Sequence, residues 1–508
     1  MVRCIPENDR LPHALYRAAQ VRELDRITIE EFGISGRTLM ERAGQAAFDL
    51  LRERWPDASD ITLLCGIGNN GGDGYVLARL AMEQGYMVHL LQLGDPGRLK
   101  GDALACAEAY RDANGAVFPF TGLPAQTDVI VDGVFGTGLE REVAGRWRNA
   151  LEAVNCHPAP VLALDVPSGL HSDTGAVLGV AVQADACITF IGLKQGMFTG
   201  QGPGHCGEIR FSALGVPAAI YARELPSARR LDWEQQSAQL APRARTAHKG
   251  EFGHLLVIGG TPGYSGAARL AAEAAARTGA GLVSVATHPE HASLMNLNCP
   301  ELMCHGVSTG RELAALLKKA TVVAIGPGLG RGLWSRDLLG RALDSGLPMV
   351  VDADALNLLA DDPLQREGWI LTPHPGEAGR LLGKSAGEIQ ADRFAAAEQL
   401  QQRYGGVVVL KGAGSLITDA RQLSPAVCSA GNPGMASGGM GDLLTGILGG
   451  LLAQGLAPAD AACIGTCLHA AAADANACDG ERGMLASDLL PGIRRLLNLP
   501  GNNRHQAR

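Results

Sequence analysis

The first part of the chain alternates short apolar runs with longer segments of helical periodicity. The apolar runs occupy residues 61–65, 87–91, 128–132, 161–165 and 186–190. Continuous apolar runs separated by helices are typical of strands that are covered on both faces, as in a parallel α/β sheet. Most of these runs end in or lead into a glycine or an acid, so we expect polar groups to gather at the carboxyl edge of the sheet.

The strand pattern fades between about Glu224 and Thr246 and then starts again. New apolar runs follow at 255–259, 282–285, 322–325, 349–352 and 407–410. A chain of 508 residues is too long for one hydrophobic core. We therefore predict a first domain at 1–225, a linker at 226–245, a second α/β domain at 246–500 and a polar tail at 501–508.

A glycine-rich segment, 431–442, leads directly into an apolar helical pattern that begins near Leu443. Glycines before a helix allow main-chain N–H groups to converge on an anion, and the helix dipole adds positive potential there. Asp442 lies among these donors, where it could accept a proton from a hydroxyl that meets a phosphoryl group. The segment therefore predicts a site of phosphoryl transfer. The simpler alternative is that Asp442 only caps the helix.

Three further loops follow predicted strands of the second half, at 326–330, 372–377 and 411–415. Each alone could be a tight turn, and His374 between two prolines could serve only to rigidify one. Together with the glycine-rich segment they predict one crevice. Lys411 directly follows a strand, but no GxxxxGK[ST] sequence occurs, so a Walker-type phosphate loop is not expected.

These motifs resemble the ribokinase-like fold and, within it, the NAD(P)H-hydrate dehydratases. The resemblance implies that Asp442 takes the proton from the hydroxyl of a hydrated nicotinamide nucleotide while Gly439–Gly441 hold the transferred phosphoryl group. It implies substrate contacts at Ala267, Gly328, His374 and Asp442. It implies nucleotide contacts at Lys411, Gly412, Ala413, Gly414, Ser415 and Gly441, with Mg²⁺ expected to accompany the nucleotide.

The first half contains Gly66–Gly71, a GxGxxG sequence between a predicted strand and a predicted helix. This alone is weak evidence for a dinucleotide-dependent redox enzyme. The longer string 68–74 places two amides and a carboxylate among the glycines. Amide and carboxylate oxygens bind cations and sugar hydroxyls as well as orienting phosphates.

Two more motifs follow, Val131–Gly138 and Leu164–Gly169. The ordered set resembles the NAD(P)H-hydrate epimerase domain, which implies a Rossmann-like three-layer fold for this half. By this resemblance, phosphate and ribose would be held by Asn69, Asn70, Gly71, Gly72, Asp73, Gly136, Thr137, Gly138, Leu139, Glu140, Arg141 and Glu142. Potassium would be bound by Asn70, Asp132 and Ser168, and Asp165 would be the acid/base at the nicotinamide ring.

Inversion of a carbon that bears a hydroxyl and a ring nitrogen requires only that the C–O bond break and form again. The nitrogen supports the cationic intermediate, and one carboxylate could serve as the acid/base. Asp132 and Asp165 could instead cap the helices that follow them. Lys194 could contact phosphate or be a surface lysine.

The bulk composition excludes several classes of function. No apolar run approaches the roughly 20 residues of a membrane span, and the N-terminus does not resemble a signal peptide. The net charge of −8 gives no basic field for nucleic acid. The 12 cysteines form no CxxC pair and indicate buried thiols in a reducing cytoplasm. A homo-oligomer is left open.

We therefore expect a bifunctional enzyme that epimerises hydrated NADH and NADPH and dehydrates the S form at the expense of ADP. ADP is chosen over ATP only because of the resemblance to the fused bacterial enzymes. One alternative is a sugar or vitamin kinase fused to a non-catalytic Rossmann-like binding module. A redox dehydrogenase is a third, less favoured interpretation, because the sequence shows no recognisable binding site for a second hydride acceptor.

Overall fold

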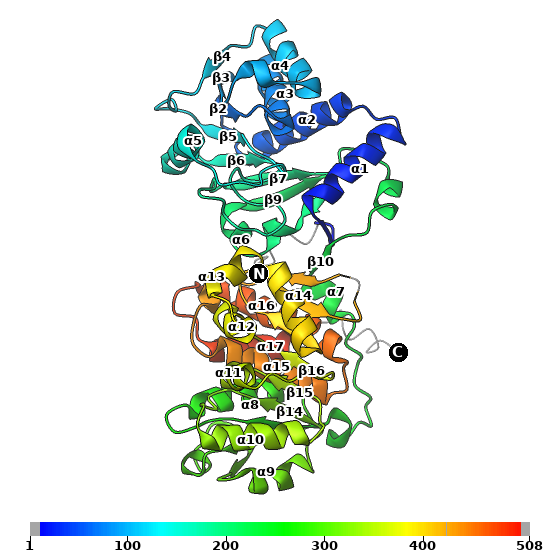
Figure 1. Ribbon diagram of the computed structural model, residues 1–508, viewed down its shortest axis with the longest axis vertical. Coiled ribbons are helices and arrows are strands. Elements are labelled where there is room, and N and C mark those ends of the chain that lie inside the picture. The colour runs from blue at the N-terminus through cyan, green and yellow to red at the C-terminus, as the bar shows by residue number, and fades with distance from the viewer. Residues whose placement is uncertain (1–10, 423, 499–508) are drawn as a thin grey trace. The chain divides into compact units, whose positions relative to one another are not determined.

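The computed structural model describes residues 11–422 and 424–498, which form two compact units that divide between Arg229 and Arg230 (Figure 1). The expected polar tail at 501–508 lies outside the described residues. Within the expected linker, 226–245, the structure has a strand, β10 (Ala228–Leu231), and a short helix, α7 (Trp233–Ser237). The sequence pattern did not predict β10, which pairs antiparallel with β1 (Ala14–Tyr16).

The N-terminal unit contains a sheet of seven parallel strands, as the apolar runs predicted. In spatial order these are β4 (Val117–Pro119), β3 (Met87–Gln92), β2 (Asp60–Cys65), β5 (Val129–Gly133), β6 (Val161–Leu164), β7 (Ala186–Phe190) and β9 (Glu208–Ser212). The chain proceeds outward from β2 in one direction and from β5 in the other. The reversal between β2 and β5 is the position at which doubly wound sheets bind ligands.

Helices cover both faces of this sheet, which makes the unit a three-layer α/β domain. On one face lie α1 (Ala18–Glu30), α2 (Gly36–Arg54), α3 (Asn69–Glu83) and α4 (Gly101–Asp112), and on the other lies α5 (Gly145–Cys156). Leu63 packs with the first group and its neighbour Leu64 packs with α5. Successive strand residues point to opposite faces, so a strand buried on both sides needs the unbroken apolar run that the sequence shows.

The C-terminal unit contains a mixed sheet whose first seven strands are parallel. Their order is β13 (Met303–Gly306), β12 (Leu282–Thr287), β11 (His254–Ile258), β14 (Val322–Ile325), β15 (Met349–Val351), β16 (Trp369–Leu371) and β17 (Val407–Leu410). Two antiparallel strands, β18 (Ser415–Asp419) and β19 (Ala426–Cys428), continue it. The strand order reverses between β11 and β14.

One face of this sheet is covered by α8 (Ser265–Thr278), α15 (Met440–Ala453), α16 (Pro458–Asn476) and α17 (Leu489–Leu496). Besides α7, the remaining α-helices of this unit are α9 (Gly310–Leu317), α10 (Leu333–Asp344), α11 (Ala353–Asp361), α12 (Pro375–Leu382), α13 (Ala386–Ala391) and α14 (Arg393–Tyr404). Helices α9 to α12 and α14 pack against one another in a continuous series (Figure 1).

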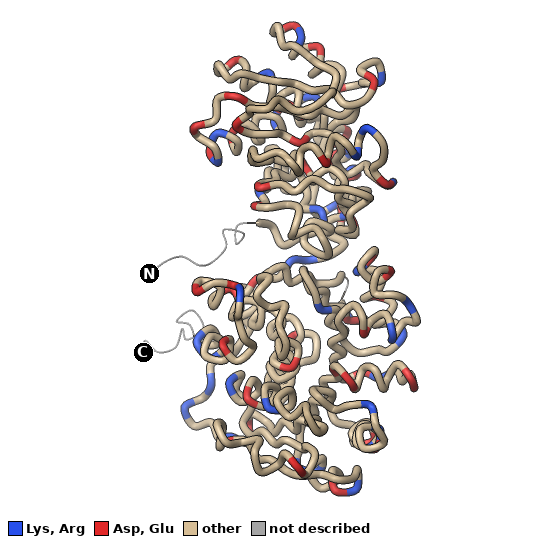
Figure 2. The backbone as a smooth tube through the Cα atoms, turned by 90° about the vertical axis from the view of Figure 1, so that its left-hand side faces the viewer, with Lys and Arg blue, Asp and Glu red and all other residues tan. Residues whose placement is uncertain are grey.

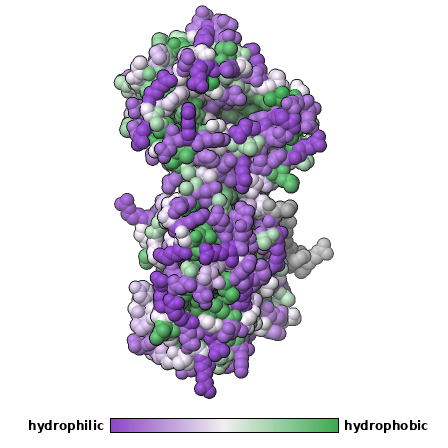
Figure 3. Space-filling model, viewed as in Figure 1, coloured by the Kyte–Doolittle hydropathy of each residue, from purple (hydrophilic) through white to green (hydrophobic). Residues whose placement is uncertain are grey.

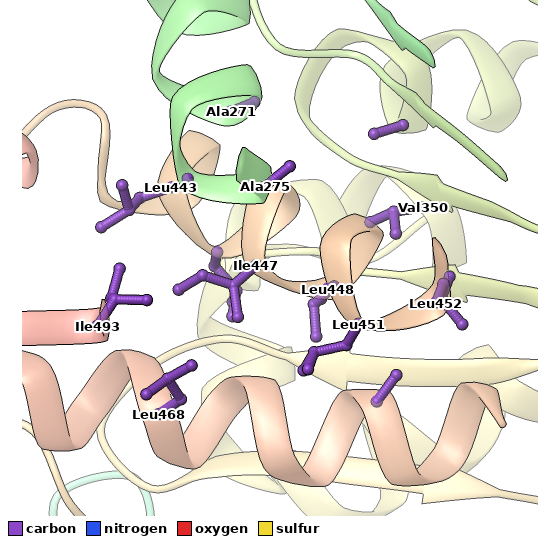
Figure 4. Close-up of a cluster of buried hydrophobic side chains, with 14 of the residues drawn as sticks. Ala271, Ala275, Val350, Leu443, Ile447, Leu448, Leu451, Leu452, Leu468 and Ile493 are labelled. Carbon is purple, nitrogen blue, oxygen red and sulfur yellow. The ribbon is translucent and has the colours of Figure 1, made fainter. Parts of the chain in front are cut away.

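Helix α15 is apolar on every side because it lies inside the C-terminal unit. Figure 4 shows Leu443 and Ile447 of α15 between α8, marked by Ala271, and α16, marked by Leu468. A Cβ on Gly446 would lie 2.0 Å from the main-chain oxygen of Ala271, so only glycine permits this helix contact. The packing fixes the start of α15, where the glycine-rich segment ends.

The surface of each unit carries a mixture of charges. Figure 2 shows Lys and Arg interspersed with Asp and Glu along both units. On the face drawn in Figure 3, hydrophilic residues predominate and hydrophobic residues form small patches. Among the described residues, no helix combines the length and the apolar character needed to cross a membrane.

Candidate active sites

A cavity of about 650 Å³ lies at the carboxyl edge of the sheet in the N-terminal unit. The loops after β2 and β5 diverge where the strand order reverses, and this leaves a crevice between them. The start of α3, the loop after β5 and one face of α1 line the cavity. Its volume falls in the range of small-molecule binding sites.

Most of the predicted phosphate- and ribose-binding residues line this cavity. They are Asn69, Asn70, Asp73, Gly136, Thr137, Gly138, Leu139, Arg141 and Glu142. Gly71, Gly72 and Glu140, although predicted, are not among its lining residues. A Cβ on Gly71 would lie 2.1 Å from the main-chain oxygen of Gly66. Gly71 therefore lets α3 begin against the end of β2, so that the free N–H groups of its first turn lie at the cavity.

Two of the three predicted potassium ligands, Asp132 and Ser168, are hydrogen-bonded to each other, and the third, Asn70, lines the cavity. The Ser168 hydroxyl donates to Oδ1 of Asp132 at 2.6 Å, and its main-chain N–H donates to Oδ2 at 2.7 Å. Burial raises the pKa of Asp132 to about 6, although the hydrogen bonds from Ser168 oppose the rise. Both polar atoms of the Asn70 amide are buried without a hydrogen-bond partner. A Cβ on Gly136 would lie 3.6 Å from Cγ of Asn70, which places this amide beside the loop after β5.

Asp165 is held by a buried lysine. The ammonium group of Lys194 donates to Oδ1 of Asp165, to the hydroxyl of Thr189 and to the main-chain oxygen of Phe190. Lys194 is 1% exposed, so the interpretation of it as a surface lysine is wrong. Asp165 has a φ of +64°, an unusual conformation for a residue with a side chain and one that is frequent at functional sites.

Among the other acids that line the cavity, Asp25 and Asp73 have pKa values that the charge of Asp165 raises. Burial raises the pKa of Asp25 on α1 to about 6, with the charge of Lys194 opposing the rise and that of Asp165 adding to it. Burial also raises the pKa of Asp73 well above its ordinary value, with the charges of Asp165 and Asp25 adding to the effect. These three of the acids that line the cavity therefore interact with one buried cation, Lys194, an arrangement suited to holding a proton near neutral pH.

In the C-terminal unit, the loops after β11 and β14 meet where the strand order reverses. Gly328 has a φ of +58°, and a Cβ there would lie 2.4 Å from the main-chain oxygen of Tyr264 and 3.3 Å from Cβ of Ala267. Only glycine allows this approach. Ala267 and Gly328, both predicted substrate contacts, therefore lie side by side.

His374 caps the N-terminus of α12. Its Nδ1 accepts from the main-chain N–H groups of Gly376 and Glu377, at 3.0 and 3.4 Å. Burial lowers the pKa of His374, with the charges of Lys411 and Arg380 adding to the effect. The ring is half-exposed, and its Nε2 lies 3.4 Å from Oε1 of Glu377. The histidine thus serves as a cap, as the rigid-turn alternative suggested, and its other ring nitrogen lies beside a buried carboxylate.

Asp442 lies in the first turn of α15, whose N-cap is Gly439 with a φ of +90°. The helix-cap alternative for Asp442 is therefore wrong. Burial raises the pKa of Asp442 to about 7, the negative charge of Asp352 adds to this rise and the positive charge of Lys411 opposes it. A Cβ on Gly438 would meet no atom within 4 Å. Open space thus lies in front of the glycine-rich segment, beside a carboxyl group able to accept a proton near neutral pH.

The predicted nucleotide loop, 411–415, surrounds the buried guanidinium group of Arg393. This group donates to main-chain oxygens of Leu410, Lys411 and Gly414, at 3.1, 3.3 and 3.4 Å. The hydroxyl of Ser415 donates to the main-chain oxygen of Gly412 and accepts from its N–H. These contacts fix the loop beside Gly441, since a Cβ on Gly441 would lie 3.4 Å from Nζ of Lys411.

Comparison with known proteins identifies the family of this chain. The family model described as NAD(P)H-hydrate dehydratase matches residues 255–495, and the YjeF-related protein N-terminus model matches residues 36–196. The bifunctional NAD(P)H-hydrate repair enzyme Nnr of Coxiella burnetii is 52% identical over 486 residues, which cover 95% of this chain and 99% of that protein. The chain belongs to the bifunctional NAD(P)H-hydrate repair enzymes.

Solved structures are similar to the dehydratase half. A ribokinase-like superfamily protein of Enterococcus faecalis is 27% identical, with a TM-score of 0.50, over 53% of this chain and 95% of that one. The ADP/ATP-dependent NAD(P)H-hydrate dehydratase of Bacillus subtilis, co-crystallized with ATP/Mg²⁺, is 30% identical, with a TM-score of 0.47, over 53% of this chain and 98% of that one.

Membership of the repair enzymes confirms the predicted combination of activities. The N-terminal unit is the epimerase domain, and the C-terminal unit is a ribokinase-like dehydratase domain. These findings do not support the sugar or vitamin kinase, the non-catalytic binding module or the redox dehydrogenase that the sequence alone left open.

Sequence reasoning missed several charged residues of the two domains. In the epimerase domain Asp25 was missed because it lies on α1, which carries no motif and precedes the matched region at 36–196. In the dehydratase domain, Asp352 and Glu377 lie around Lys411, with Nζ–carboxylate distances of 2.7 and 3.8 Å. The signal for Asp352 was present, because it ends an apolar run as Asp132 and Asp165 do.

The cysteines agree in part with the expectation of buried thiols. Ten cysteines of the described residues are free, and eight of these are buried. Cys478 is not one of the free thiols.

Proposed function

We propose that the epimerase domain interconverts the R and S forms of hydrated NADH and NADPH with Asp165 as the acid/base, and that the dehydratase domain converts the S form to NAD(P)H with ADP as the phosphoryl donor. The proposed boundaries of these activities are residues 1–225 and 246–500. The position of Asp442 behind the glycine-rich segment, with a pKa near 7, is the observation that carries the dehydratase assignment.

The dehydration follows from leaving-group chemistry. Asp442 accepts the proton of the substrate hydroxyl as that oxygen attacks the terminal phosphoryl group of ADP, which releases AMP. The ring nitrogen then assists expulsion of phosphate, and loss of a proton from the adjacent carbon restores the dihydropyridine. Gly439–Gly441 would hold the phosphoryl group, Lys411–Ser415 the nucleotide, and Ala267, Gly328 and His374 the substrate. Mg²⁺ on the nucleotide would offset the phosphate charge.

The epimerisation requires a hydroxide to leave and to return to the other face of the ring. Asp165 would supply the proton to the departing hydroxyl and recover it from the returning water, while Lys194 maintains the orientation of the carboxylate. The loop 136–142 and the start of α3, at 69–73, would hold the phosphates and ribose. Asn69 and Asn70 present the N-terminus of α3 to the cavity, where an anion is favoured.

The donor set at Asn70, Asp132 and Ser168 fits a monovalent cation. The Asn70 amide is buried with an unpartnered oxygen, and a bound K⁺ would satisfy it. Across residues 11–422 and 424–498, no group of three histidine, cysteine or carboxylate side chains is placed to hold a metal. One carboxylate with neutral oxygens suits a singly charged ion. Potassium would supply positive charge against the substrate phosphates.

Product analysis tests the dehydratase assignment. Hydrated NADH incubated with the full chain and ADP should regain the dihydropyridine absorbance, with one AMP and one phosphate formed per NADH by ³¹P NMR. ATP in place of ADP should give a lower rate. Accumulation of a phosphorylated hydrate without regained absorbance would refute the dehydratase mechanism, and a preference for ATP would refute the choice of donor.

A cation titration tests the potassium site. Epimerisation should rise with K⁺ and be weak in tetramethylammonium at the same ionic strength. Asn70→Ala should raise the K⁺ concentration for half-maximal rate by about tenfold, since it removes one ligand. Equal epimerisation rates in the two cations would exclude the site.

A further inference from the structure

Asp352 occupies the N-cap position of α11 but does not cap it. The residue follows β15 directly, is 1% exposed and makes no side-chain hydrogen bond to the start of α11. The next residue, Ala353, has a φ of +49°, which strains the turn between strand and helix. An aspartate at the end of a strand is ordinarily explained as a helix cap. That explanation fails here, and the carboxylate has other partners.

The Asp352 carboxylate connects two elements that are distant in the sequence. Its Oδ1 accepts from Nζ of Lys411 at 2.7 Å, and its Oδ2 accepts from the hydroxyl of Thr445 at 2.7 Å. Lys411 begins the nucleotide loop after β17, and Thr445 lies on α15 three residues beyond Asp442. One buried carboxylate therefore connects the nucleotide loop to the helix that carries Asp442.

The main chain of Asp352 is fixed as well. Its N–H donates to the main-chain oxygen of Ile325 at 3.1 Å. A Cβ on Gly326 would lie 1.8 Å from the main-chain oxygen of Asp352, and Gly326 has a φ of +128°. The loop after β14, which carries Gly328, is thus packed directly against Asp352. The residue contacts the substrate loop, the nucleotide loop and α15.

Asp352 also belongs to the charges around Asp442. The groups that act on Asp442 are Asp352 and Asp354 at the start of α11, Glu377 on α12 and Lys411 after β17. Burial alone would lower the pKa of Lys411, but the charges of Asp352 and Glu377 outweigh burial and raise it. Lys411 therefore stays charged, held to Asp352 by both a hydrogen bond and an ion pair.

We propose that Asp352 is a positioning residue for the dehydration: it holds the Lys411 ammonium group and the first turns of α15 so that Asp442 faces the substrate hydroxyl. This inference rests on the proposed role of Asp442. Asp352 would act through its neighbours, since its carboxylate orients Lys411 of the nucleotide loop and the helix that carries Asp442. Its negative charge acts on the proton affinity of Asp442 through the buried surroundings.

The test compares pH profiles of dehydration for the wild type, Asp352→Asn and Asp352→Glu. Asp352→Asn should lower kcat by about 100-fold, because displacement of catalytic groups by about 1 Å has that effect. The acid limb of kcat/KM should move to lower pH by about one unit, since a negative charge that raised the pKa of Asp442 is removed. Asp352→Glu keeps the negative charge. The acid limb of its kcat/KM profile should therefore stay near that of the wild type even if its kcat falls.

Three controls separate the possible failures. Asp361→Asn removes an exposed carboxylate from the same helix and should leave kcat and the pH profile unchanged. Thr445→Val removes a hydrogen bond but no charge, so it should reduce kcat without moving the limb. Near-ultraviolet circular dichroism verifies that each variant is folded.

The outcomes are distinguishable from those for Asp442. If Asp352→Asn has the kcat and the acid limb of the wild type while Asp442→Asn is inactive, the positioning role is refuted and the proposed function stands. If Asp442→Asn retains dehydration, the proposed function itself fails. If Asp352→Asn is folded and has low activity, but the acid limb of its kcat/KM profile lies at the wild-type pH, the electrostatic part of the proposal is refuted.

Discussion

Lys194 and Asp165 form an ion pair in which the lysine side chain is 1% exposed and the aspartate side chain is 16% exposed. Both residues line the cavity, but the lysine ammonium group is surrounded by its three acceptors and the aspartate is the more exposed of the two. Within the pair, the aspartate is therefore the group that a substrate can approach more readily. An acid/base that must act on both faces of a ring benefits from a fixed orientation of this kind.

Replacement of Lys194 by methionine should impair epimerisation selectively. The carboxylate of Asp165 would lose the hydrogen bond that orients it, so we expect the epimerisation rate to fall about 100-fold. Dehydration of purified S epimer by the same preparation should be unchanged. NMR exchange between the R and S forms measures the first rate. Lys100→Met, at an exposed lysine of the same domain, is the matched control, and a Lys194→Met protein that epimerises at the wild-type rate would contradict the role.

Gly136 and Gly138 provide a matched pair in the loop after β5. A Cβ on Gly136 would lie 3.4 Å from Oδ2 of Asp165 and 3.5 Å from Cβ of Asn70, which is ordinary contact without a clash. A Cβ on Gly138 would meet nothing within 4 Å. Gly136→Ala should therefore fold normally but place a methyl group between the acid/base and the proposed cation ligand. We expect its epimerisation rate to fall roughly tenfold or more, with little change for Gly138→Ala.

Thermal unfolding should show that both alanine variants are as stable as the wild type. Equal epimerisation rates for the two variants would mean that the space between Asn70 and Asp165 is not used by the substrate.

The pH dependence of dehydration should reflect Asp442. A general base must be ionised, and burial with the charge of Asp352 raises the pKa of this carboxyl to about 7. Above pH 7 the base is mostly ionised, so kcat/KM should be level there and fall about tenfold per pH unit below it. Asp442→Asn should lower kcat by about 10² to 10⁴ and abolish that acid limb. A wild-type profile that stays level down to pH 5 would show that Asp442 is not the base.

The fold was accessible from the sequence because its determinants are local. Runs such as Val407–Leu410 are apolar at every position, which only a strand covered on both faces requires. The glycines after the strands indicated the crevices, and Gly66 and Gly328 are indeed where backbones meet too closely for a side chain. Strand β10 was missed because it is short and two of its four residues are arginines, unlike the other runs.

Much of the charge network could not be predicted in the same way. Lys411 and Thr445 are 59 and 93 residues from Asp352, and their pairing depends on the strand order of the sheet. A local pattern identifies Asp352 as an acid at a strand end but does not say whether its carboxylate caps a helix or turns inward. The position of Asp25 beside Asp165 could not be predicted either, because the sequence of its helix shows only amphipathic periodicity. Partners across the sheet require three-dimensional placement.

His469 should make the dehydratase domain less stable in acid. This residue of α16 is 6% exposed, its Nε2 has no hydrogen-bond partner, and burial, with the charge of Lys411, lowers its pKa to about 4. In the unfolded chain a histidine titrates near 6.5. Between these values the unfolded state binds a proton that the folded state does not. The free energy of unfolding should therefore fall as the pH drops from about 6.5 to 4, by roughly 2 kcal/mol at pH 5.

His469→Gln removes this titration, so its free energy of unfolding should depend less on pH. We expect the loss between pH 7.5 and pH 5 to be smaller than in the wild type by that same amount, roughly 2 kcal/mol. Urea unfolding, followed by hydrogen exchange in peptides of α15 and α16, isolates the domain concerned. His248→Gln, at a side chain that is 75% exposed, should keep the wild-type dependence. If His469→Gln loses as much stability in acid as the wild type, the buried imidazole is not the group whose protonation opposes folding.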